Sequence, residues 1–122
     1  MTTQAAFHVP PVNKRSRIPM RTIRAMATHI AERFDPEEII LFGSHAYGKP
    51  DGWSDVDLLV VMDTPKGEME TALEIVKSLP PLSFSVDIIA RSRDVLEKRK
   101  KMGDWFLREV TQKGKVLYGR DH

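Results

Sequence analysis

Two aspartates at the start of an apolar segment are the residues best suited to chemistry in this sequence. Asp55 and Asp57 lie in LFGSHAYGKPDGWSDVDLLVV, residues 41–61. Side chains at alternate positions of a strand point to one face, roughly 6.6 Å apart along the chain. That face continues with Leu59 and Val61, so both carboxylates are expected where the buried core begins. A purely structural strand would avoid such charges, which indicates a functional site.

A third aspartate, Asp87, interrupts the apolar and small residues of LSFSVDIIA, residues 82–90. If this segment is a strand beside the first, Asp87 lies about 4.8 Å from the row of Asp55 and Asp57. Two unit charges about 4 Å apart repel by about 1 kcal/mol in water and about 4 kcal/mol near a protein surface. The three carboxylates therefore predict a metal site. Oxygen-only ligands favour magnesium, with manganese as the alternative.

The glycine turn before these aspartates predicts a phosphate site. A strand that ends at Phe42, followed by Gly43 and Ser44 at the start of a helical turn, presents free backbone N–H groups that attract phosphate. The Ser44 hydroxyl can add a donor, and Gly48 lets the backbone pass close to a ligand. The long glycine-rich loop of the common NTPases does not occur in the sequence. A phosphate site beside a carboxylate-held metal predicts a metal–nucleoside triphosphate as ligand.

The elements that position these residues follow from the hydrophobic periodicity. We expect strands over 38–42, 55–62, 82–90 and, as a short edge strand, KVLYG at 115–119. We expect helices from Pro19 to about Phe34, from Ser44 as a short turn or helix, over 68–79, and over 93–113. This order predicts an α/β fold, a mixed sheet flanked by helices. We expect residues 1–17 to form a flexible N-terminal tail and residues 18–122 a single domain.

Composition and charge limit the functional classes. With no cysteine, disulfides and thiolate metal sites are excluded and a cytoplasmic location is the default. No apolar run approaches the ~20 residues of a membrane-spanning helix. Basic residues dominate before Glu32 and again at 98–101, although the formal net charge is only +2. These runs could bind nucleic acid, phosphates or an acidic partner. We favour a solubilising surface and expect no direct nucleic-acid binding.

The segment GSHAYGKPDGWSDVDLLV resembles the G-S…G…S-D-x-D-L motif of the DNA polymerase β-like nucleotidyltransferase superfamily. The short chain resembles its minimal branch, the minimal nucleotidyltransferases, and the resemblance covers roughly 19–118. The matching positions are Gly43, Ser44, Gly48, Ser54, Asp55, Asp57 and Leu58, with Asp87 in the place of the third carboxylate. That branch often has arginine where this chain has His45 and Tyr47, so a role of those arginines in binding triphosphate does not carry over.

The resemblance implies a small nucleotidyltransferase fold and transfer of AMP, or another NMP, from a magnesium–ATP complex to a hydroxyl acceptor. It implies that Asp55 and Asp57 hold two magnesium ions and that Asp87 binds the ion nearer the acceptor and takes its proton. Gly43 and Ser44 would hold the outgoing pyrophosphate.

The resemblance also implies a partner. Many minimal nucleotidyltransferases pair with a helical HEPN ribonuclease toxin as its antitoxin, and the acceptor is then expected to be a toxin tyrosine. Two alternatives stay open: a non-catalytic antitoxin that caps its partner, and a small-molecule transferase of the aminoglycoside type. A homo- or hetero-oligomer is compatible with either, and the sequence leaves the acceptor and the preferred nucleotide open.

Overall fold

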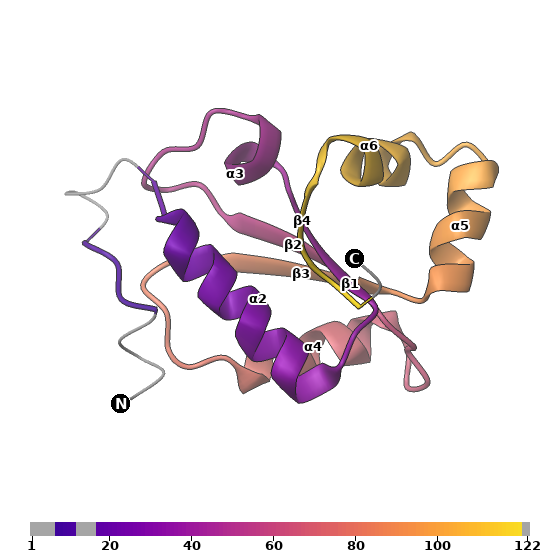
Figure 1. The fold of residues 1–122 in the computed structure, drawn as a ribbon, viewed down its shortest axis with the longest axis horizontal. Helices are drawn as coiled ribbons and strands as arrows, with labels where there is room; N and C mark the ends of the chain where they lie inside the picture. The colour runs from indigo at the N-terminus through magenta and orange to yellow at the C-terminus, as the bar shows by residue number, and fades with distance from the viewer. Residues whose placement is uncertain (1–6, 12–16, 121–122) are drawn as a thin grey trace.

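A four-stranded sheet in the order β3-β2-β1-β4 lies at the centre of the computed structural model, which describes residues 7–11 and 17–120. The elements in chain order are α2 (Met20–Phe34), β1 (Glu38–Phe42), α3 (Ser44–Tyr47), β2 (Val56–Val61), α4 (Glu68–Ser78), β3 (Val86–Arg91), α5 (Arg93–Lys101), α6 (Trp105–Lys113) and β4 (Lys115–Gly119). In Figure 1, α2 and α4 lie below the sheet, α3 and α6 lie above it, and α5 stands at its right-hand end.

The sheet is mixed, because its strands pair in both directions. β1 pairs antiparallel with β2 and, on its other side, with β4. β2 and β3 run parallel, with α4 as the connection between them. The expected α/β fold with a mixed sheet flanked by helices is therefore confirmed. No helix in the described ranges is long and apolar enough to cross a membrane.

Alternating side chains of β2 fill two separate cores. Val56, Leu58 and Val60 belong to the core under α2 and α4. Leu59 and Val61 belong to a smaller core with residues of α5 and α6. This period of two is the one expected for a strand that is covered on both faces. Asp57 has the same parity as Leu59, so it lies on the α5–α6 side of the sheet.

The C-terminal helix differs from the expected continuous helix over 93–113. It is broken into α5 and α6 by the residues that follow Lys101. Gly103 has φ 98°, a conformation that ends a helix and favours glycine. Asp104 then begins α6, since its carboxylate accepts a hydrogen bond from the Leu107 N–H at 3.0 Å. β3 also begins at Val86, four residues later than the expected start at Leu82.

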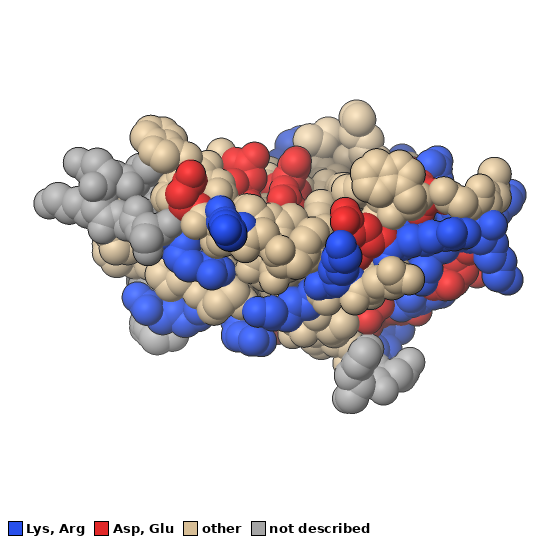
Figure 2. Space-filling view, turned by 90° about the horizontal axis from the view of Figure 1, so that it is seen from above, with Lys and Arg blue, Asp and Glu red and all other residues tan. Residues whose placement is uncertain are grey.

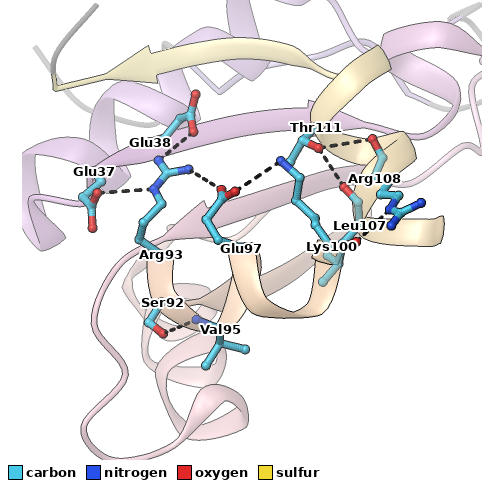
Figure 3. A network of polar contacts seen from close by, with 10 residues as sticks. All are labelled: Glu37, Glu38, Ser92, Arg93, Val95, Glu97, Lys100, Leu107, Arg108 and Thr111. Atoms are coloured by element: carbon cyan, nitrogen blue, oxygen red, sulfur yellow. Dashed lines mark hydrogen bonds and ion pairs between the residues drawn. The ribbon is translucent and has the colours of Figure 1, made fainter. Parts of the chain in front are cut away.

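The first turn of α5 is joined to the start of β1 by a cluster of ion pairs (Figure 3). The Arg93 guanidinium lies 3.0 Å from Glu38 and 3.5 Å from both Glu37 and Glu97. Burial lowers the pKa of Arg93, but the hydrogen bond and charge of Glu38, followed by Glu37, raise it above its usual value overall. Arg93 therefore stays charged and holds α5 against the sheet.

A flexible tail was expected over residues 1–17, but the described part of this segment packs against the domain. Phe7 and Val9 are buried in the core that α2 covers. The Phe7 ring meets the His29 ring edge-on, with 5.9 Å between centroids. Two apolar residues outside any periodic segment carry no signal of this packing. Residues 1–6 and 12–16 lie outside the described residues.

Candidate active site

The three predicted carboxylates come together at one end of the sheet. Asp57 is the register partner of Asp87 in the parallel pair of β2 and β3, and of Phe42 in the antiparallel pair with β1. Asp55 directly precedes β2. The expected distance of one strand spacing between the Asp57 and Asp87 backbones thus follows from direct pairing of the two strands. Figure 2, viewed from the side of α3 and α6, shows acidic side chains gathered in the middle of this face and basic ones over the end formed by α5.

The electrostatics of this cluster fall mainly on Asp57. Desolvation by burial, then the charge of Asp87, then the charge of Asp55, raise the pKa of Asp57 to about 6. Like charges and burial both disfavour the ionised carboxyl, whereas a bound cation would favour it. The order of these causes shows that Asp87 acts on Asp57 more strongly than Asp55 does, as expected from the direct pairing of β2 with β3.

Gly43 lies directly against the Asp57 carboxylate. Its φ of 74° is in the left-handed region that favours glycine. A Cβ atom added at Gly43 would overlap Asp57 Oδ2. Both the turn and the carboxylate therefore require glycine here. The sequence predicted Gly43 as a residue close to phosphate, whereas the structure shows that its nearest side chain is a predicted metal ligand.

Ser44 and Gly48 are the two ends of the short helix α3. The Gly48 N–H donates to the Ser44 carbonyl oxygen at 3.1 Å. A Cβ atom at Gly48 would lie only 2.7 Å from Ser44 Cα, so the absence of a side chain lets the helix close tightly. The expected close approach of the Gly48 backbone is thus made to Ser44 within the protein. Ser44 itself follows Gly43 directly and is only partly buried.

A buried histidine joins α3 to the residue before Asp55, which the sequence did not predict. His45 lies in α3, and only 3% of its surface is exposed. Its Nε2 donates to the Ser54 carbonyl oxygen at 3.1 Å. Burial is the main cause that lowers the pKa of His45. The neutral ring therefore links the glycine turn to the chain that leads into Asp55.

Ser54 also takes part in a turn with Asp51, as its sequence context predicted. The Asp51 carboxylate accepts from the Trp53 N–H at 2.8 Å and from the Ser54 hydroxyl at 3.1 Å. The Trp53 hydrogen bond, followed by that of Ser54, lowers the pKa of Asp51. Trp53 itself is 81% exposed and does not pack over the core. The turn fixes the backbone and leaves the indole in solvent.

Replacing His45 with alanine is expected to destabilise the protein by about 2–4 kcal/mol, because a buried ring and a hydrogen bond to Ser54 are both lost. The free energy of unfolding, measured by urea denaturation, checks this. His8, which is exposed, provides the matched control, and His8→Ala is expected to change the stability by less than about 0.5 kcal/mol. Equal stabilities of the two variants would contradict the linking role of His45.

The donor chemistry of the site fits a hard divalent cation. All three predicted ligands are carboxylates, and a bound cation would offset both the burial and the neighbouring charges that raise the pKa of Asp57. Among the described residues, however, no group of three or more His, Asp or Glu is gathered closely enough to hold one ion. The register of β2 and β3 thus places the Asp57 and Asp87 backbones side by side. The carboxylates themselves are not close enough together for three of them to bind one ion.

A mixed sheet that joins neighbouring strand carboxylates to a glycine turn places the chain in the class of nucleotidyltransferase-fold proteins. The sequence profile of the nucleotidyltransferase domain family matches residues 23–118, and the chain belongs to that family. Domains of this family generally use a nucleoside triphosphate and a divalent metal.

A solved structure has a similar fold. It is a crystal structure of a protein from Sulfolobus solfataricus that is provisionally described as a nucleotidyltransferase. The two chains are 20% identical and superpose with a TM-score of 0.56, over 81% of this chain and 78% of the other. No curated protein matches the sequence. The expected superfamily is therefore confirmed, together with its small fold.

Proposed function

We propose that this chain transfers AMP, or another NMP, from a magnesium-bound nucleoside triphosphate to a hydroxyl group of a protein. The observation that carries the proposal is the direct pairing of Asp57 with Asp87, beside a glycine turn whose backbone lies against Asp57. Structural strands rarely bring two carboxylates together on neighbouring positions, because they repel. The family match supports nucleotidyl transfer in general.

In the proposed reaction, the acceptor oxygen attacks the α-phosphorus of the triphosphate. A new oxygen–phosphorus bond forms, the bond to the β-phosphate bridging oxygen breaks, and pyrophosphate leaves. Asp87 accepts the hydroxyl proton, since it is the more exposed of the paired carboxylates. Asp55, Asp57 and Asp87 would hold the magnesium, which supplies neutralisation of the phosphate charge. Gly43 and Ser44 would bind the outgoing pyrophosphate through backbone N–H groups and the hydroxyl.

Nucleotide binding tests the proposed site directly. Magnesium with ATP is expected to raise the melting temperature of the wild type by a few degrees, because a ligand that binds only the folded state stabilises it. Asp87→Asn is expected to lose most of that shift, while its melting temperature without ligand stays near that of the wild type. Differential scanning fluorimetry measures both quantities.

Asp63→Asn is the matched control for this experiment. Asp63 is an exposed aspartate just beyond the other end of β2, and its replacement is expected to leave the ligand-induced shift unchanged. A wild type that shows no shift at millimolar magnesium and ATP would exclude the proposed nucleotide site.

For the acceptor, we propose a tyrosine of an HEPN-type ribonuclease toxin, with this chain as its antitoxin. Resemblance to the minimal nucleotidyltransferases supports this partner, and a tyrosine hydroxyl suits the mechanism above. An added adenylate would block RNA at a ribonuclease centre through its bulk and negative charge.

Incubation of the chain with ATP, magnesium and a purified HEPN-type protein tests the acceptor. Mass spectrometry of the partner is expected to show an AMP-sized gain that disappears with Asp55→Asn. An unmodified partner that is neutralised equally by the wild type and Asp55→Asn would favour the capping alternative. Transfer to an aminoglycoside-type small molecule in place of the protein would favour the second alternative.

A further inference from the structure

An apolar groove runs along the outer edge of the sheet, between α4 and β3. It has a volume of about 460 Å³, and α4 and the whole of β3 line it. Three large apolar side chains of α4 border the groove and remain exposed: Met69 by 78%, Leu73 by 47% and Val76 by 41%. Their spacing places them on one side of the helix. A helix face of this kind marks an interaction surface.

The strand beside this face is an outer strand of the sheet in the described part of the chain. The carbonyl oxygens of Ser85 and Arg91 accept hydrogen bonds from the β2 side. Because successive residues of a strand point their backbone groups to opposite sides, the groups of Val86, Ile88 and Ala90 point to the outer edge. Such an edge is a template for pairing with another strand.

The charged residues that flank the apolar face of α4 are placed so that two copies of the helix, related by a two-fold axis, would bring opposite charges together. Glu70 and Lys77 are both exposed and stand two helical turns apart, so they share one flank of α4. They lie almost symmetrically on either side of Leu73. When two copies of α4 pack antiparallel across Leu73, Glu70 of each copy lies opposite Lys77 of the other.

The edge strand shows the same complementarity. When two copies of β3 pair antiparallel about Ile89, the outward backbone groups of Ile88 meet those of Ala90 in the second copy. The same register sets Asp87 opposite Arg91 of the second copy, whose guanidinium lies 3.5 Å from Glu68 within its own chain and would gain Asp87 as a second acidic neighbour. α4 lies on one face of the sheet beside β3 (Figure 1), and a symmetric dimer requires that one axis perpendicular to the sheet generate both contacts.

We propose that the chain forms a symmetric dimer in which β3 pairs with β3 of a second copy and α4 packs against its α4. The two sheets join into one continuous sheet, and the exposed apolar side chains of α4 become buried. Each copy also contributes Arg91 beside Asp87 of the other. A cation from the second copy then lies at the edge of the candidate active site. Within one copy, residues 45 and 47 are histidine and tyrosine and supply no arginine to that site.

Sedimentation equilibrium of the 122-residue chain tests the dimer through a charge exchange. The wild type is expected to sediment at twice its mass of 13.9 kDa. Glu70→Lys and Lys77→Glu, each alone, set like charges opposite one another twice and are expected to raise the dissociation constant about tenfold. The double variant restores opposite charges and is expected to return to the wild-type value. Both residues are exposed, so circular dichroism is expected to show unchanged folding.

A second pair of variants distinguishes this surface from others. Leu73→Glu is expected to yield a monomer, whereas Met102→Glu, at an exposed apolar residue that follows α5, is expected to leave the dimer intact. A monomer at every concentration up to about 100 μM, far above the dissociation constant of a stable dimer, overturns the proposal. A dimer that Leu73→Glu does not weaken, or single charge variants that the double variant does not rescue, overturns it as well.

Discussion

Replacing Asp57 with asparagine is expected to reduce nucleotidyl transfer at least about a hundredfold and, at the same time, to stabilise the folded protein at neutral pH. The loss of transfer follows from the removal of a charged ligand that acts on the transition state. The gain in stability follows from the burial of the Asp57 carboxylate and, after it, the charges of Asp87 and Asp55, which together raise the pKa of Asp57 to about 6. The charged Asp57 side chain therefore lowers the free energy of unfolding at neutral pH, and Asp57→Asn is expected to restore it.

The pH dependence of that gain has a definite sign. In the unfolded chain the carboxyl of Asp57 titrates near its ordinary value of 3.8, and in the folded protein near 6. Its contribution to stability is therefore fully present below about pH 4 and is lost as the pH rises through 6. Because asparagine does not titrate, the advantage of the variant grows between these values and is constant above them. We expect on the order of 1–2 kcal/mol, after allowing for solvent screening of a partly exposed group.

Urea denaturation of the metal-free protein at several pH values measures this advantage, and a transfer assay with labelled ATP measures the rate. Asp63→Asn is again the control, with unchanged transfer and no growing advantage between pH 4 and 6. A destabilised Asp57→Asn variant at pH 7 would show that the carboxylate is a structural group, contrary to the interpretation of the cluster.

Replacing Gly43 with alanine is expected to have the second largest effect, a reduction of transfer by about a hundredfold together with a loss of about 2–4 kcal/mol of stability. The first cause is the left-handed backbone at φ 74°, which costs about 1–2 kcal/mol for a residue with a Cβ atom. The second cause is the overlap of that atom with Asp57 Oδ2, which forces the carboxylate to move. A shift of this size at a catalytic group is sufficient for the loss of rate.

Gly67 provides a control that separates the two causes. It also has a positive φ, 105°, but an added Cβ atom would meet nothing within 4 Å. Gly67→Ala is therefore expected to lose only the backbone contribution to stability and to keep the wild-type transfer rate. The same assays apply to both variants. Equal effects of the two replacements on the rate would mean that contact with Asp57 plays no part.

The sequence was sufficient to predict the sheet and the carboxylates, for physical reasons that are easy to state. A strand covered on both faces requires apolar residues at nearly every position, so the exceptions at Asp57 and Asp87 stand out from the pattern. Their pairing followed from the assumption that the two strands are neighbours, which the parallel register confirms. The fold followed from the alternation of strands and helices.

Contacts between distant segments could not be predicted in the same way. Good helix-forming residues precede and follow the break between α5 and α6, so a single helix was expected over 93–113 and the turn at Gly103 was missed. His45 is a polar residue whose burial depends on a single carbonyl group nine residues later. Phe7 is an isolated aromatic residue in a segment without periodicity. None of these three contacts has a local pattern that would announce it.

The packing of the N-terminal segment bears on where this domain can be cut. The family profile begins at residue 23, inside α2, whereas Ile18 is fully buried and Phe7 and Val9 are nearly so. Protein trimmed to the matched region would lose the first turn of α2 and three core side chains, and would leave apolar surface beside His29 open to water. The folded domain thus includes residues before the region that the family profile matches.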